Sequence, residues 1–189
     1  MQNIVSFYTE ATPNPETMKF VANRYISQEV IAEFRSADEA ERSPLAQRLF
    51  SFPFIQNVFF SQNYITITRK KGTDWDEVIP LLKDFLKNYL ESGMPIFKEM
   101  EAVAEDDGNT SETVLRIKQI LKDYIQPAVE QDGGAIHYKA FDEAQGIVTV
   151  RLKGSCSGCP SSMITLKAGI EGLLKRMVPE VKEVIADAA

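Results

Sequence analysis

The sequence is poor in the residues that bind metals or crosslink secreted proteins. Its 189 residues include two cysteines and one histidine. Two cysteines cannot form the disulfide framework of a small secreted domain. No apolar run approaches the roughly 20 residues that span a bilayer, and the N-terminal residues lack the pattern of a secretory signal or a transit peptide. We therefore expect a cytoplasmic protein without a membrane partner.

Positive charge is also scarce relative to negative charge. The chain has 21 lysines and arginines against 27 aspartates and glutamates, a formal net charge of −6. This balance leaves no broad basic field of the kind that attracts nucleic acid, so we expect no nucleic-acid partner. The sequence shows neither a Ser–His–Asp set nor a phosphate-binding glycine loop, and we expect no enzymatic activity.

Charge and periodicity divide the chain into two predicted domains. Residues 100–112 carry five acids and no base, and the periodic patterns stop before this stretch and restart after it. Acidic, glycine-containing stretches of this kind are typical of solvated linkers. We predict domains at 1–99 and 113–189 joined by an acidic linker at 100–112. A long surface loop within one domain is the alternative.

The first domain is predicted to mix strands and helices. Alternating residues predict strands at 3–9 and 17–23, and 55–70 read as a hairpin that turns at Ser61–Asn63. The prolines of the segment TPNPE predict a turn between the first two strands. An amphipathic helix is expected over 74–93, with Trp75 as a packing anchor at its start, Gly93 at its end and a buried stripe of Val78, Leu81, Leu82, Phe85, Leu86 and Tyr89.

The second domain is predicted to follow the order α-β-β-α-β. A helix over 111–130, capped by Thr110 or Ser111, is followed by strands at 135–141 and 146–152, a helix from Pro160 and a strand at 180–186. The predicted buried stripes are Val114, Ile117, Leu121, Tyr124 and Ala128 in the first helix, and Met163, Leu166, Ile170, Leu173, Leu174 and Met177 in the second. The expected fold class is α/β (α+β) in two small domains.

Both cysteines lie in the segment GSCSGCP, where Cys156 and Cys159 are separated by two residues and precede a predicted helix. The unpaired N–H groups and the dipole at a helix N-terminus stabilise thiolates. Gly154 and Gly158 keep the loop free of bulky side chains and tolerant of unusual φ angles.

Three chemistries use a pair of cysteines with this spacing. A thioredoxin-like redox pair follows the first strand of a βαβ unit, whereas here one predicted strand remains after the motif. A zinc site needs about four ligands, so a second chain would have to contribute; His137, in a predicted strand, reads as a half-exposed sheet residue. An iron–sulfur cluster takes about four thiolates, which two copies of the chain would supply. The remaining hypothesis is that both cysteines are buried and have no chemical role.

From Asp132 onward the sequence resembles the C-terminal domain of the NifU/Nfu family. The matching segments are DGG at 132–134, VRLKGSCSGCPSSMITLKAGIEGLL at 150–174 and VPEV at 178–181. The resemblance implies an iron–sulfur scaffold or carrier. In such proteins Cys156 and Cys159 of each protomer would bind a 4Fe–4S cluster shared between two chains, and the homodimer would pass it to apo iron–sulfur proteins. Upstream assembly proteins are the other implied partners. Ser155, Ser157, Ser161 and Ser162 are candidate hydrogen-bond donors to cluster sulfur.

Residues 1–99 resemble the N-terminal domain of stand-alone Nfu proteins. The matching stretches are TPNPETMKF at 12–20, SFPFIQNVFFSQNYITITR at 51–69, and a tryptophan before a helix at 75. The resemblance suggests that the TPNPE loop is a recognition surface. Since the domain contains no cysteine, its expected role is docking of target proteins or control of the spacing between protomers.

Overall fold

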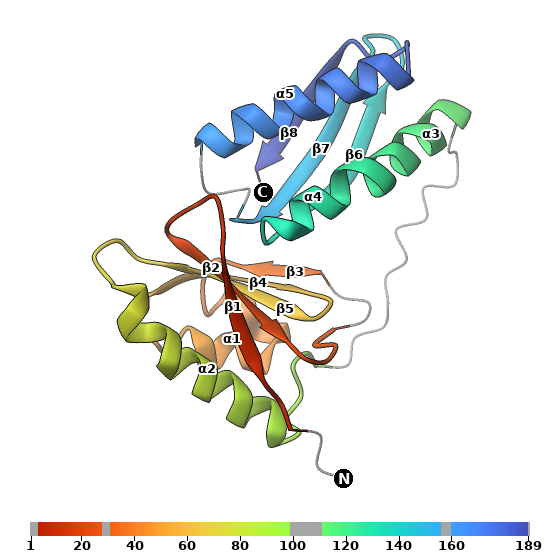
Figure 1. Cartoon of the computed structure of the whole chain (residues 1–189). Helices are drawn as coiled ribbons and strands as arrows, with labels where there is room; N and C mark the ends of the chain where they lie inside the picture. The colour runs from red at the N-terminus through yellow and green to blue at the C-terminus, as the bar shows by residue number, and fades with distance from the viewer. Residues whose placement is uncertain (1–3, 28–30, 99–110, 156–159, 189) are drawn as a thin grey trace. The chain divides into compact units, whose positions relative to one another are not determined.

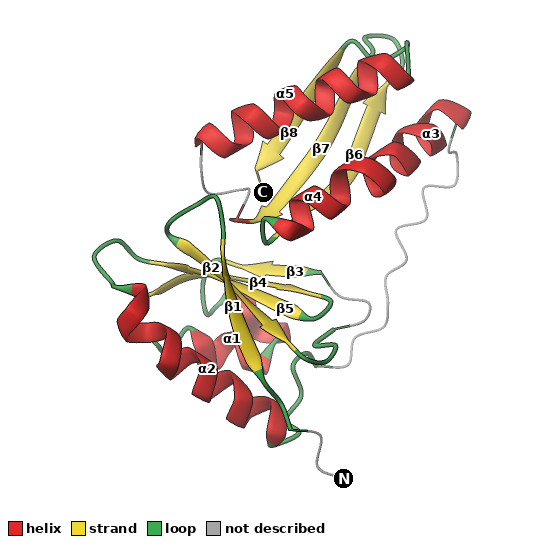
Figure 2. Cartoon of the chain, in the orientation of Figure 1, coloured by secondary structure: helices red, strands yellow, loops and turns green. Residues whose placement is uncertain are grey.

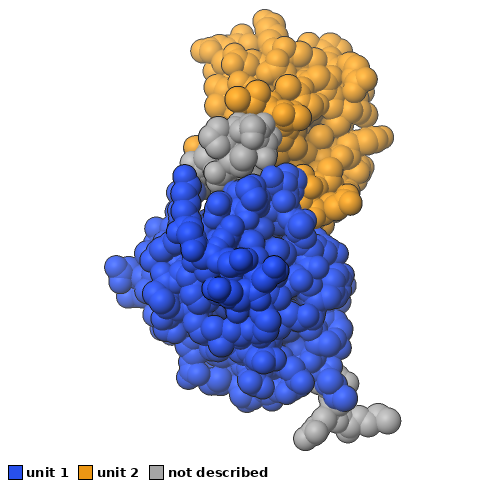
Figure 3. Space-filling model, turned by 60° about the vertical axis from the view of Figure 1, so that its left-hand side comes forward, with its two compact units in different colours: residues 1–100 blue, residues 101–189 orange. Residues whose placement is uncertain are grey.

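The computed structural model describes residues 4–27, 31–98, 111–155 and 160–188 and forms two compact units, Met1–Met100 and Glu101–Ala189. Figure 3 draws the two units in different colours. Both units combine a sheet with helices, so the predicted mixed α/β class in two small domains is confirmed. Most of the predicted linker, 100–110, lies outside the described residues, and its boundaries stay a prediction. Within the described part, no helix has the length and apolar character needed to cross a membrane.

The first unit is a five-stranded antiparallel sheet with its helices on one face (Figures 1 and 2). The strand order across the sheet is β1 (Phe7–Ala11), β2 (Thr17–Ala22), β5 (Tyr64–Arg69), β4 (Ile55–Ser61) and β3 (Ala32–Phe34). The helical elements are η1 (Glu39–Arg42), α1 (Pro44–Leu49) and α2 (Trp75–Glu91). The predicted strand at 17–23, the hairpin at 55–70 and the helix at 74–93 are confirmed within one to two residues.

The first strand starts later than predicted. The Asn23 side chain forms hydrogen bonds with the backbone that precedes β1. Its Oδ1 accepts a hydrogen bond from Ser6 N at 3.1 Å, and its Nδ2 donates one to Ile4 O at 2.9 Å. One backbone hydrogen bond, from Asn23 N to Ser6 O at 3.1 Å, is also made there, and regular pairing of β1 with β2 begins at Phe7. The prediction of a strand at 3–9 is therefore wrong at its first residues.

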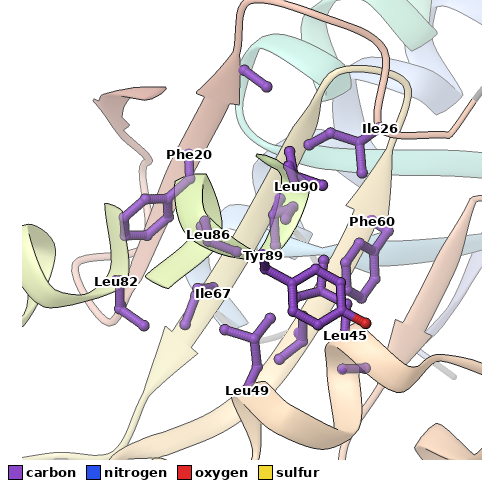
Figure 4. Close-up of a cluster of buried hydrophobic side chains, with 14 of the residues drawn as sticks. Phe20, Ile26, Leu45, Leu49, Phe60, Ile67, Leu82, Leu86, Tyr89 and Leu90 are labelled. Atoms are coloured by element: carbon purple, nitrogen blue, oxygen red, sulfur yellow. The ribbon is translucent and has the colours of Figure 1, made fainter. Parts of the chain in front are cut away.

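The core of the first unit lies between the sheet and helices α1 and α2. Figure 4 shows Leu82, Leu86 and Tyr89 of α2 among the side chains of α1 and the strands. Leu82 and Leu86 are fully buried, whereas Leu81, predicted in the same stripe, is 48% exposed. Successive residues of a helix are rotated by about 100° about its axis, so the Leu81 side chain lies to one side of the buried face that carries Leu82 and Leu86.

The second unit packs all its helices on one face of a three-stranded sheet (Figure 1). The elements in chain order are α3 (Glu112–Ile120), the π-helical turn η2 (Leu121–Ile125), α4 (Gln126–Gln131), β6 (Gly134–Asp142), β7 (Ile147–Gly154), α5 (Pro160–Met177) and β8 (Glu183–Ala188). The central strand β7 pairs antiparallel with β6 and parallel with β8. This confirms the predicted order α-β-β-α-β, the Ser111 cap on Val114 N and the α5 stripe.

The π-helical turn moves the buried face of the first helical run. The prediction placed Tyr124 and Ala128 in the core, but Tyr124 is 58% exposed, and Ile125 and Val129 are buried instead. A π turn holds one more residue than an α turn, so buried positions beyond it shift by one residue. A uniform helical period therefore gives the right face before η2 and the wrong one after it.

Candidate functional site

The two candidate ligands lie outside the described residues, but both flanking segments are defined. Cys156 and Cys159 lie in the sequence between the end of β7 at Gly154 and the start of α5 at Pro160. The predicted helix start directly after Cys159 is confirmed. Ser157 and Gly158 lie outside the described residues as well, as do the side chains of Ser161 and Ser162.

Strand β7 holds the segment before the cysteines rigidly in the sheet. Val148, Val150 and Leu152 are fully buried against the helices, and the residues between them face the other side. The strand ends at Gly154, whose φ of +74° lies in the left-handed region that residues with a Cβ disfavour. Gly154 thus supplies the unusual φ that the sequence predicted for this loop.

A second segment, Asp132–Gly134, fastens the residue that precedes Cys156. The Ser155 hydroxyl donates a hydrogen bond to the Asp132 carbonyl oxygen, and Ser155 N donates to Gly133 O at 3.3 Å. Gly134 pairs with Gly154 in the sheet, and Gly133 takes a φ of +78° that turns the chain from α4 into β6. Figure 1 shows this turn beside the end of β7. We call Asp132–Gly134 with Gly154 and Ser155 the glycine clamp.

The glycine clamp corrects the role predicted for Ser155. Ser155 is buried, and its single hydroxyl proton is donated to the Asp132 carbonyl oxygen. That proton therefore anchors the backbone and is not a donor to cluster sulfur. The sequence predicted DGG as a helix stop only. The family resemblance did contain a signal for this contact, because DGG at 132–134 and the cysteine motif are both among the matching segments.

Helix α5 is fixed to the sheet on the other side of the cysteines. Glu171 Oε2 accepts a hydrogen bond from Val184 N of β8 at 3.1 Å, and Oε1 accepts one from Lys175 Nζ at 2.6 Å. The Lys175 hydrogen bond, followed by the Val184 N–H, holds the pKa of the Glu171 carboxyl below its usual value. The carboxylate therefore stays ionised near neutral pH and ties α5, which starts one residue after Cys159, to β8.

Few other side chains in the described part could complete a metal site. His137 lies half-buried in β6, as predicted. Among the described residues, no three His, Cys, Asp or Glu side chains gather closely enough to hold a metal ion. Further ligands for Cys156 and Cys159 would thus come from a second chain or from outside the described part.

The TPNPE loop forms the predicted turn, and Trp75 anchors it. The loop connects β1 to β2. Asn14 Oδ1 accepts a hydrogen bond from Glu16 N at 3.0 Å, and Trp75 Nε1 donates to Pro15 O at 3.0 Å. The Trp75 ring also packs against Phe20, with 6.4 Å between the ring centroids. These contacts confirm Trp75 as a packing anchor, while a recognition role for the loop stays a prediction.

Removing the Ser155 hydroxyl tests the glycine clamp. The resemblance implies that the protein can be loaded with an iron–sulfur cluster. For the loaded protein, we expect Ser155→Ala to keep the fold but to raise the rate at which a chelator removes iron by about threefold to tenfold, the equivalent of one hydrogen bond. Ser155→Thr, which keeps a hydroxyl, should recover part of the loss. The matched control is Ser61→Ala, because the buried Ser61 hydroxyl has no hydrogen-bond partner within the described residues. Equal rates for Ser155→Ala and the control would contradict a role for the clamp.

Each of the two units matches the model of a known protein family. Residues 7–93 match the family model described as scaffold protein Nfu/NifU N terminal, and residues 117–185 match the NifU-like domain. The two matches fall in separate structural units, and the second spans the glycine clamp, both cysteines and the whole of α5.

Several relatives are similar over nearly the whole chain. NifU-like protein 4, mitochondrial, of Arabidopsis thaliana is 39% identical over 180 residues, which cover 93% of this chain and 64% of that protein. The human NFU1 iron-sulfur cluster scaffold homolog, mitochondrial, is 38% identical over 181 residues, which cover 93% of this chain and 69% of that protein. The chain thus spans about two thirds of the length of these relatives. A solution structure of a NifU-like protein from Saccharomyces cerevisiae matches 52% of this chain and 89% of its own, with a TM-score of 0.47 and 22% identity.

Proposed function

The chain belongs to the Nfu/NifU scaffold family, and we propose that it binds a 4Fe–4S cluster between two protomers and transfers it to apo-proteins. Cys156 and Cys159 of each protomer are the proposed ligands. The observation that carries the proposal is the thiol count of this chain: two cysteines, placed between a fixed strand end and a helix start, in a sequence with no third. A cluster takes about four thiolates, so two copies supply the set.

The proposed cluster is cargo, and the protein is a carrier without enzymatic activity. The N-terminus of α5 and its unpaired N–H groups favour the negative charge of thiolates and of a thiolate-ligated cluster. The glycine clamp and Glu171 would hold the two ends of the cysteine segment in place. The proposed partners are apo iron–sulfur proteins and upstream assembly proteins. The cytoplasmic location is likewise a proposal, since the relatives named above are mitochondrial proteins.

Direct transfer is tested by competition between an acceptor and a chelator. The reconstituted protein is mixed with a cysteine-bearing apo-acceptor and an excess of a strong iron chelator, and acceptor activity is followed with time. We expect the acceptor to gain its cluster at a rate that the chelator leaves largely unchanged, because an incoming thiolate displaces a ligand without free iron. If the chelator collects all the iron and the acceptor receives none, direct transfer is wrong.

We propose that the first unit docks targets and takes no part in holding the cluster. It contains no cysteine, and its hydrophobic core is separate from that of the second unit. In the same assay, a fragment that starts at Ser111 should bind a cluster but deliver it more slowly to at least some acceptors. Circular dichroism establishes that the fragment is folded. A folded fragment that cannot hold a cluster would contradict this division of roles.

A further inference from the structure

The sheet of the second unit has one face without helices. Helices α3, α4 and α5 pack on the other face, and the residues of β7 alternate strictly between buried and half-buried. No element of the same unit covers the half-buried face within the described residues. The side chains that point to this face near the cysteine end of the sheet are His137, Lys139, Arg151, Lys153 and Asp187. We call this set the basic face.

The basic face carries more positive than negative charge. Lys139 Nζ and Arg151 Nη2 share one carboxylate oxygen, Asp187 Oδ2, at 2.8 and 3.7 Å. The Lys139 hydrogen bond and charge hold the pKa of Asp187 below its usual value, so this carboxylate is ionised near neutral pH. Three permanent cations, Lys153 included, thus face one carboxylate. The Arg151 side chain is 40% exposed, so part of it can contact a partner.

This surface includes the end of the strand that precedes the proposed cluster ligands in the sequence. Strand β7 runs toward Gly154, so Arg151 and Lys153 belong to its last four residues, and Lys153 is three residues before Cys156. The sheet register places two more carboxylates on this side, Asp142 and Glu183. Both lie at the opposite end of β7, in register with Ile147, and Glu183 is 3.9 Å from Lys167 of α5. Positive charge therefore gathers at the cysteine end.

We propose that the basic face is a docking surface for acidic apo-acceptor proteins on the second unit, in addition to the docking proposed for the first unit. This inference rests on the proposed function, because a partner bound here would bring its own cysteines close to Cys156. Charge complementarity identifies the occupant: the face is cationic in a chain whose net charge is −6. A second copy of the chain is disfavoured, since two basic faces repel each other. Nucleic acid and anionic membranes are disfavoured by the overall negative charge and by Asp187 at the centre of the face.

Docking can be measured without a cluster. The cluster-free, ¹⁵N-labelled full chain is titrated with an acidic apo-ferredoxin, and amide shift changes are followed at low and high salt. Within the second unit, we expect the changes to concentrate on β6, β7 and β8, and we expect binding to weaken as salt screens the charges. Lys139→Glu and Lys153→Glu should each weaken binding about tenfold at low salt. The matched control is Lys122→Glu, an exposed lysine on the helical side with the same change of charge, which should alter binding by less than about twofold.

Two results would overturn the proposal. One is shift changes in the second unit that map to α3 and α4, leave β6, β7 and β8 unaffected, and respond to Lys122→Glu as strongly as to the face variants. The other is equal binding of duplex DNA or of phosphatidylserine vesicles at the same residues, which would make the surface a general polyanion site. Since the titration uses cluster-free protein, its failure is distinguishable from failure of cluster binding or transfer, which the chelator competition measures.

Discussion

Replacing either Cys156 or Cys159 with serine is expected to abolish stable cluster binding and to leave the fold intact. Serine offers a hard hydroxyl oxygen where an iron–sulfur cluster requires a soft thiolate. Because each cluster would be shared by two copies, a single substitution removes half of the thiolates. The described hydrophobic core of the second unit is formed by residues of α3, η2, α4, α5, the strands and the connection between α5 and β8, and it needs no cluster to form. Loss of the cluster should therefore not unfold the chain.

Anaerobic reconstitution followed by visible absorption and by iron and sulfide analysis measures this loss. The unchanged chain should show charge-transfer absorption and matched iron and sulfide, and either serine variant should show neither after desalting. The far-ultraviolet circular dichroism and the melting temperature of the apo forms should agree among all three proteins. A variant that retains a full complement of iron and sulfide would show that the other ligands suffice, and the assignment of that cysteine would be wrong.

The elements that the sequence predicted well are those with one regular period. The hairpin of β4 and β5, helix α2 and helix α5 have clear alternation or a clear helical stripe, and their capping residues agree with the pattern. Asp74 accepts a hydrogen bond from Asp76 N at the start of α2, and Gly93 follows the helix with a φ of +70°. Local propensity, capping and burial point to the same structure at these places, so the prediction holds.

The elements that the sequence missed are short or depend on distant contacts. Helix α1 has six residues and strand β3 has three, too few for periodicity to stand out. The start of α1 depends on Ser43, whose hydroxyl donates to Ile96 O, 53 residues away in the chain, and accepts from Ala46 N. The π-helical turn η2 likewise has no signature in the sequence, and the residues after it were assigned to the wrong face.

The sequence predicted the candidate ligands of the site but not the hydrogen bonds that hold the neighbouring backbone in place. The spacing of the cysteines and the helix start at Pro160 can be read locally, because they are neighbours in the chain. The glycine clamp joins Asp132 to Ser155 across 23 residues, and it forms only because β6 and β7 pair with Gly134 opposite Gly154. Sheet register depends on the whole unit and cannot be read from either segment alone.

Cluster binding is expected to convert the protein from monomer to dimer. About four thiolates are needed, and one chain offers two, so two cysteine segments meeting on a two-fold axis complete the set. The apo chain should be largely monomeric, because the exposed large hydrophobic side chains described in the second unit lie singly on separate elements: Leu115, Tyr124, Ile164 and Ile185. The cluster itself would then supply the free energy of association.

Size-exclusion chromatography with light scattering, run anaerobically on apo and reconstituted protein, measures the conversion. The apo form should elute at the 21.2 kDa of one chain and the reconstituted form at twice that mass. Oxidation or chelation of the cluster should return monomers, and the Cys156→Ser and Cys159→Ser variants, which bind no cluster, should stay monomeric after the reconstitution treatment. Those variants control for association caused by iron or reductant alone. A monomer that carries a full 4Fe–4S cluster would falsify the shared-ligand arrangement, because its remaining ligands would have to come from the same chain.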